Sequence, residues 1–209
     1  MSILIEALTA DALSTLMGQP PTSLAALGLS KWWRRKAEEA REILLEELKH
    51  GVRLNGDFET DIFYSLVFRY LNAVKQGTAR RNLRLLAQMI NSGISKNHEL
   101  SVDEISALAD TAASLSREEI ALIAALWSSH ANHDFPHSEE DGLVMQKATL
   151  DELVPNIFAS NSEVFATASM LMRTGLVTMP SVWGGNRIDT TEKFYRLMKV
   201  CNVESVLEQ

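Results

Sequence analysis

The chain has 209 residues, and 46% of them are hydrophobic, which is enough to build a substantial core. Its formal net charge is −7, but residues 51–98 carry seven basic and three acidic side chains (+4), and residues 99–209 carry seven and seventeen (−10). The hydrophobic content argues against disorder. A membrane helix is not expected, because no apolar run approaches the roughly 20 residues that a span needs. The acidic C-terminal segment disfavours DNA as a ligand, since DNA affinity depends largely on basic side chains.

Cys201 is the only cysteine, so no internal disulfide can form, and a reducing cytoplasm is the expected setting. Its apolar surroundings, LMKVCNV, favour a buried thiol over a reactive one. The N-terminal residues MSILIEAL lack a basic start, and Glu6 and Asp11 interrupt the apolar residues, so we expect no signal peptide.

Residues 1–97 are expected to form a helical part. It begins with a short apolar helix from Ile3 to Met17, ended by the sequence GQPP, and a second apolar piece from Ser23 to Leu29. A long helix from about Lys31 to His50 follows, with Ser30 as its N-cap. Its narrow apolar stripe consists of Trp33, Ala37, Ala40, Leu44 and Leu48.

Two amphipathic helices complete this part. The first begins at Phe58, has a wide apolar face and ends before Gly77 and Thr78. The second reads TARRNLRLLAQMINSG and ends near Gly93. Because both helices carry large apolar side chains at helical spacing, we expect this pair to form the core of the N-terminal part.

Helix starts in residues 98–209 are predicted by a repeated capping box. In this motif a Ser or Thr hydroxyl and a Glu carboxylate three residues later each bind a backbone N–H of the first turn. The helix that begins at the box of Thr149 is expected to be short, because Pro155 disrupts its backbone hydrogen bonding. The four boxes pair Ser101 with Glu104, Ser116 with Glu119, Thr149 with Glu152, and Ser160 with Glu163.

The last box opens a helix that is followed by a hairpin. The predicted inward face of this helix consists of Val164, Phe165, Ala168, Leu171 and Met172. Gly175 follows as a left-handed stop residue. Val177–Met179 and Arg187–Asp189 can then pair as short strands around a loop that contains Pro180 and two glycines, before a closing helix.

The order of these elements is that of a winged helix. Three helices, at Ser116–Ser128, Leu150–Ala159 and Ser162–Thr174, precede the hairpin. The motifs LMRTGLV and RIDTTEKFYRLM resemble the ending of many bacterial winged-helix regulators, and a similar ending occurs in the phage Abi-alpha abortive-infection family. The expected fold is therefore all-α with one small antiparallel hairpin: a helical bundle in residues 1–97 and a winged-helix-like part in residues 98–209.

The resemblance implies that the third helix meets the major groove and that the hairpin touches the DNA backbone or minor groove. The candidate contact residues on the outward side of that helix and on the wing are Thr167, Met170, Arg173, Trp183, Asn186 and Arg187. Only Arg173 on the helix can make a strong phosphate or guanine contact. A helix so poor in cations favours contact with a protein over contact with DNA.

Two basic clusters lie in the N-terminal part. Arg80, Arg81 and Arg84 fall within about one turn on the side expected to face solvent, where they suit phosphate, an acidic partner or the acidic segment of the same chain. The stretch KWWRRK, residues 31–36, suits nucleic acid or a membrane surface. The simpler expectations are ion pairing within the chain for the arginines and packing against their own neighbours for the tryptophans.

The polar loop SSHANHDFPHSEEDG holds the ligand types of a transition-metal site. Its candidate ligands are His130, His133, Asp134 and His137. Their spacing matches no closed zinc motif, and a catalytic site would need three converging ligands with an open position. We therefore expect no metal or other cofactor.

These observations predict a non-enzymatic cytoplasmic protein, of bacterial or phage-related type, that interacts with or regulates another protein. The partner is a different protein or a second copy, since the long charged helix and the strong helices after it allow a homodimer. The alternatives are a DNA-binding winged-helix transcriptional regulator and a metal-dependent hydrolase that uses the loop at residues 130–137. No membrane association is expected.

Overall fold

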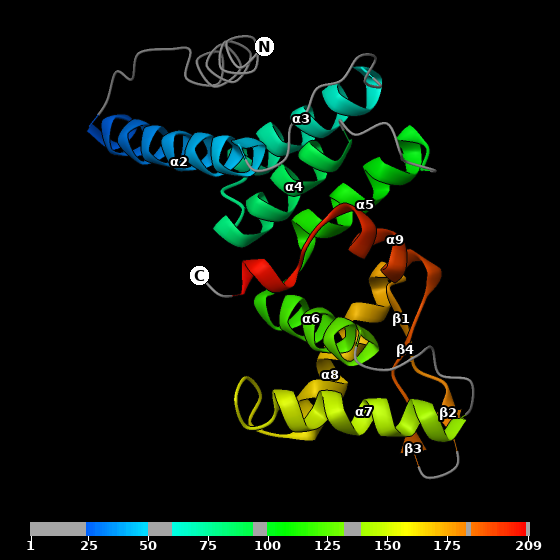
Figure 1. Ribbon diagram of the computed structural model, residues 1–209. Helices are drawn as coiled ribbons and strands as arrows, with labels where there is room; N and C mark the ends of the chain where they lie inside the picture. The colour runs from blue at the N-terminus through cyan, green and yellow to red at the C-terminus, as the bar shows by residue number, and fades with distance from the viewer. Residues whose placement is uncertain (1–23, 50–59, 94–99, 132–138, 183–184, 208–209) are drawn as a thin grey trace. The chain divides into compact units, whose positions relative to one another are not determined.

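The computed structural model describes residues 24–49, 60–93, 100–131, 139–182 and 185–207 (Figure 1). Helices make up most of these residues, together with a small antiparallel hairpin, which confirms the expected mainly helical fold class. The chain forms two compact units, residues 1–114 (unit 1) and residues 115–209 (unit 2). The helix expected at residues 3–17 lies outside the described residues. None of the helices in the described ranges has the length and apolar character needed to cross a membrane.

The first described helix of unit 1, α2 (Leu24–Lys49), is longer than predicted. The expected start near Lys31 with Ser30 as the N-cap is wrong, because the preceding residues LAALGL favour a helix and contain no proline that would break it. Trp33 is half-buried. The buried stripe confirms the prediction and gains Ile43, so that it contains Ala37, Ala40, Ile43, Leu44 and Leu48.

Helix α4 (Arg80–Gly93) is contacted by the other described helices of unit 1. Helices α3 (Thr60–Lys75) and α5 (Val102–Ser114) flank it, and α2 also contacts it. The predicted break between α3 and α4 is present at Gly77, whose φ of 71° is the left-handed conformation that glycine adopts most easily. Many of the apolar side chains of α3 and α4 are buried, as expected for core helices.

Polar contacts fasten α5 to unit 1. The hydroxyl oxygens of Ser65 and Ser106 lie 2.9 Å apart, and Asn82 Nδ2 donates to the Ala112 carbonyl over 2.8 Å. The compact units therefore divide after Ser114, whereas the boundary predicted from the sequence falls after residue 97. The division of the chain into separately folding domains at residue 97 stays a prediction.

Three helices precede the hairpin in the described residues of unit 2. They are α6 (Arg117–Ala131), α7 (Glu139–Leu153) and α8 (Asn161–Leu171), and a single 3-10 turn, η1 (Met172–Thr174), continues α8. After the hairpin come α9 (Glu192–Val200) and a second 3-10 turn, η2 (Glu204–Val206). Helix α8 contacts both α6 and α7, and its C-terminal end leads directly into the hairpin (Figure 1).

Capping boxes open α5 and α6 as predicted, and the predicted serine cap opens α8. The Glu104 and Glu119 carboxylates accept hydrogen bonds from the backbone N–H groups of Ser101 and Ser116 over 2.9 and 2.8 Å. At α8 the Ser160 side chain accepts from the backbone N–H of Glu163. The Glu163 carboxylate binds the N–H of the preceding Ala159 over 2.9 Å rather than that of the capping serine.

The capping box predicted at Thr149 is wrong. Thr149 lies inside α7, near its end, where its hydroxyl donates to the Met145 carbonyl over 3.0 Å and to Ser129 Oγ over 3.1 Å. The helix starts at Glu139 and ends before Pro155, which lacks the N–H that a further turn would need. Thr149 therefore makes contacts inside a helix instead of capping the start of one.

The predicted hairpin is present as two short ladders. Strand β1 (Val177–Thr178) pairs with β4 (Asp189–Thr190), and β2 (Ser181–Val182) pairs with β3 (Gly185–Asn186). Pro180 lies between the two ladders on one side, and the Arg187 N–H donates to its carbonyl over 3.1 Å. The second strand of the first ladder lies slightly later in the chain than predicted.

The closing helix α9 buries Phe194, Leu197 and Val200. The ring of Phe194 lies 6.3 Å from that of Trp127 on α6, measured between centroids. Cys201 follows, and its buried thiol donates to the Leu197 carbonyl over 3.2 Å. Burial raises the pKa of this thiol to about 12, which confirms the expected buried cysteine.

Candidate functional site

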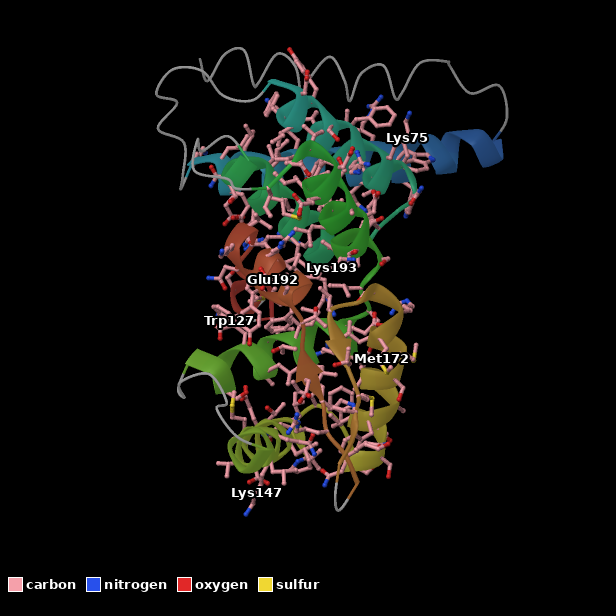
Figure 2. The ribbon with its side chains drawn as sticks, turned by 90° about the vertical axis from the view of Figure 1, so that its right-hand side faces the viewer. Lys75, Trp127, Lys147, Met172, Glu192 and Lys193 are labelled. Carbon is pink, nitrogen blue, oxygen red and sulfur yellow. The ribbon has the colours of Figure 1, made fainter. Side chains whose placement is uncertain are left out.

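The outward face of α8, with η1, is the candidate site. The inward face is confirmed at Val164, Ala168 and Leu171, which are buried, and Phe165 is half-buried. The prediction that Met172 faces inward is wrong, because the chain tightens into the 3-10 turn at this residue and its side chain is exposed (Figure 2).

The outward face carries few charges. Met170 is 61% exposed, and Thr167 is half-buried beside it. Ser169 is exposed, but its hydroxyl donates back to the Phe165 carbonyl over 2.8 Å. The candidate contact residues on the helix are therefore placed on one surface, as predicted, and that surface is mostly neutral.

The C-terminal end of α8 is fixed by the start of α9. Gly175 has a φ of 72°, as expected for the stop residue. The Thr191 hydroxyl donates to the Gly175 carbonyl over 2.7 Å, and Lys193 Nζ donates to the Thr174 carbonyl over 2.6 Å. These bonds satisfy carbonyl groups at the end of the helix and set the direction in which its outward face points.

Arg173, the cation predicted to contact phosphate, forms an ion pair inside unit 2. Its two terminal nitrogens donate to the Glu119 carboxylate of α6, with Nη2 at 3.2 Å from Oε2. The Glu119 side chain is 1% exposed, and the Arg173 side chain is 48% exposed. Because a buried carboxylate needs a counter-ion, this guanidinium stabilises the fold. Sequence reasoning identified Glu119 only as a capping residue.

Arg187 on the hairpin is also paired. Its Nε and Nη2 donate to the two carboxylate oxygens of Asp189 over 2.6 and 2.8 Å, a bidentate arrangement. Its side chain lies against Gly142 of α7, where an added Cβ would come within 3.1 Å of Arg187 Cδ. The two-residue spacing, which places both side chains on one side of an extended segment, was a signal that could have predicted this pair.

Gln146 of α7 holds the hairpin in place and was not singled out from the sequence. Its Oε1 accepts from the Ile188 N–H over 2.8 Å, and its Nε2 donates to the Asn186 carbonyl over 3.3 Å. The side-chain amide thus binds the strand as a neighbouring strand would. Gly142 and Gln146 are four residues apart, so they lie on the same face of α7.

The remaining wing residues are placed differently. The Asn186 side chain is exposed, whereas Trp183 lies outside the described residues. The wing therefore presents Asn186 to solvent next to an arginine that is already bound to a carboxylate. This arrangement offers hydrogen-bond groups but little positive charge.

The basic cluster of α4 is not the uniform solvent-facing group that was predicted. Arg84 is buried, with its side chain 7% exposed, and it contacts the carboxylates of Glu46 at 2.6 Å and Glu47 at 3.4 Å. Arg80 is exposed, 3.7 Å from Glu39, and Arg81 is half-buried. Packing of α4 against α2 buries Arg84. Helix α2 supplies the acidic side chains that compensate its charge. The partners of Arg80 and Arg84 in the described residues, Glu39, Glu46 and Glu47, come from α2 of the same unit.

The tryptophans of the KWWRRK stretch pack within unit 1. The rings of Trp32 and Trp33 meet edge to face at 4.8 Å, and Trp32 lies over Gly77, where an added Cβ would come within 3.1 Å of its ring. Lys36 pairs with Glu39 at 3.0 Å. The ring contact agrees with the simpler expectation that the tryptophans pack against their own neighbours.

The candidate metal ligands are largely outside the description of the structure. His133, Asp134 and His137 lie in an undescribed segment, and the side chain of His130, in α6, is not described either. Among the side chains that the structure does describe, no group of three His, Cys, Asp or Glu residues could hold a metal ion. The metal-dependent hydrolase stays an untested alternative.

Comparisons with known proteins assign no family. No protein-family model, no curated protein and no solved structure matches the chain. The likeness of the C-terminal part to winged-helix proteins therefore stays a prediction that rests on the order of its helices and hairpin.

Proposed function

We propose that the protein is a non-enzymatic cytoplasmic interaction or regulatory protein of bacterial or phage-related type, and that α8 with η1 contacts a protein partner. The observation that carries this proposal is the pairing of both candidate arginines of the helix and wing with carboxylates. Arg173 binds the buried Glu119, and Arg187 binds Asp189. A phosphate would have to compete with a carboxylate of the same chain for each guanidinium.

The apolar groups on this part of unit 2 also support a protein partner. Met170 and Met172 are exposed on α8 and η1, and Ile157 is exposed on the segment before α8. Methionine is flexible and polarisable, and it is enriched at protein interfaces, where basic side chains are not required for affinity. The acidic balance of residues 99–209 points in the same direction, because it repels DNA.

The first experiment measures retention of the full-length protein on random-sequence duplex DNA from low to moderate salt. We expect little retention at any salt concentration. Retention that falls steeply with salt, and that is reduced by Asn186→Ala, would instead support the DNA-binding regulator. Arg173→Ala is unsuitable for this test, since it also removes the counter-ion of Glu119.

The second experiment tests the contact face directly. Proteins captured from a lysate by the wild-type chain are compared with those captured by Met170→Glu and by the control Val144→Glu. Val144 is an exposed apolar residue of α7 and is matched to Met170 in exposure. We expect the methionine variant to lose a specific partner and the control to keep it. Equal capture by all three proteins would contradict a role for α8.

A further inference from the structure

Helix α3 of unit 1 carries an apolar stripe on its exposed side. Phe68 is 64% exposed, and Tyr64, one turn earlier, is exposed too. Leu71 is half-buried at the next position of the stripe. Opposite this stripe, α3 buries Ile62, Leu66, Tyr70 and Ala73, so the helix is already packed into unit 1 by its other face. A large exposed aromatic pair at helical spacing is typical of a surface that contacts a protein.

Charged residues lie at the two ends of the same stripe. Asp61 in the first turn and Lys75 in the last turn are both exposed, and each is seven residues from Phe68. Seven residues are about two turns, so all three side chains lie on one side of the helix. The stripe therefore reads acidic, aromatic, basic from its start to its end, with Phe68 at its midpoint.

This pattern is complementary to itself when it is reversed. If two copies of α3 pair antiparallel about Phe68, Asp61 of each copy lies opposite Lys75 of the other, and the two phenylalanines meet at the centre. A parallel pairing would place like charges together, which is unfavourable. The antiparallel arrangement also opposes the two helix dipoles. A two-fold axis that maps one surface onto itself is the usual symmetry of a homodimer.

We propose that α3 is a homodimerisation helix, and that two copies of the chain pair antiparallel through Tyr64, Phe68 and Leu71 with Asp61–Lys75 ion pairs at both ends. The inference is independent of the proposed partner of α8, because it concerns a different unit. A helix of 16 residues is about 24 Å long, so this contact is a small one and the dimer should be weak.

The test is sedimentation of the full-length protein over a concentration range from about 1 µM to about 1 mM. We expect concentration-dependent dimerisation. Phe68→Asp should raise the dissociation constant of the dimer by about tenfold or more, since it places a charge at the centre of the contact. The matched control is Val144→Asp, an equally exposed apolar position in α7 of unit 2, which should leave the dimer unchanged.

Charge reversal tests the direction of pairing. Asp61→Lys and Lys75→Asp should each weaken self-association, by about threefold to tenfold. An equimolar mixture of the two variants should associate again, because each copy then meets opposite charges at both ends of the other. Circular dichroism of every variant checks that the helices remain folded.

Three results would overturn the proposal. A wild-type protein that stays monomeric over the whole range would exclude the dimer. A dimer that survives Phe68→Asp, or a mixture of charge variants that fails to associate, would place the interface elsewhere.

Discussion

The two units solve the same electrostatic problem in opposite ways. In unit 1 the most buried member of an ion-paired cluster is the base: the Arg84 side chain is 7% exposed, and its partners Glu47 and Glu46 are 15% and 51% exposed. In unit 2 the buried member is the acid: Glu119 is 1% exposed, and its partner Arg173 is 48% exposed. In each unit the exposed partner exists to compensate a charge that the fold has removed from water.

This difference predicts which substitution in each pair should lower the free energy of unfolding more. Removing the exposed partner leaves an uncompensated charge in the interior, whereas removing the buried group leaves a solvated charge at the surface. The cost of a mutation in these pairs therefore follows the burial of the residue that remains, not the burial of the residue that is changed.

The largest effect is expected in unit 2. Arg173→Met should lower the free energy of unfolding by about 2–4 kcal/mol, because it leaves Glu119 buried without its counter-ion. Glu119→Gln should cost only about 1 kcal/mol, since glutamine also completes a capping box with Ser116. Denaturant unfolding followed by circular dichroism measures both variants, with Arg196→Met, from an exposed pair on α9, as the control.

Equal losses for the Arg173 and Glu119 variants would contradict the comparison. The control should change stability by less than about 0.5 kcal/mol, because its pair with Glu192 is solvated. A control loss as large as that of Arg173→Met would mean that any arginine in this unit has the same effect, whatever its partner's burial.

In unit 1 the order of the residues is reversed. The double substitution Glu46→Gln and Glu47→Gln should destabilise this unit by about 2 kcal/mol, since Arg84 then remains buried with no carboxylate at either contact. Arg84→Met should cost less, about 1 kcal/mol, because methionine keeps much of the packing and both glutamates lie nearer to solvent. Hydrogen exchange of α2 and α4 measures the change within the unit, and a larger loss from Arg84→Met would reverse the conclusion.

Intermediate and near-zero effects are expected at two glycines, each covered by a long side chain. Gly77→Ala should cost about 1–2 kcal/mol, because φ is 71° and the new Cβ would press on Trp32. Gly142→Ala should be neutral within about 0.5 kcal/mol, since the gain in helix propensity offsets the displacement of Arg187. Thermal unfolding of the two variants compares them, and a strong loss for Gly142→Ala would show that Arg187 cannot move.

Local signals in the sequence predicted most of the fold. Capping boxes at Ser101 and Ser116, the serine cap at Ser160 and the stop at Gly175 depend on neighbouring residues only, so they could be identified from spacing. The failed box at Thr149 shows the limit of such signals. The same two residue types, three apart, occur in helix interiors, where Thr149 binds a carbonyl one turn earlier.

The candidate site was predicted in position but not in its chemistry. Arg173 was placed on the outward face, yet its partner Glu119 lies 54 residues earlier on another helix. Likewise, Arg84 occupies a position at the edge of the polar face of α4, and only the packing of α2 shows that this edge is buried. Charge compensation between helices depends on tertiary contacts, which the periodicity of one helix does not encode.

The burial of Cys201 has a practical consequence for all of these measurements. Because its thiol is the only one in the chain and its pKa is raised to about 12, hardly any reactive thiolate exists at neutral pH while unit 2 is folded. Alkylation of this residue must therefore wait for opening of the unit. The rate of labelling in the intact protein consequently reports the opening of unit 2 around Cys201.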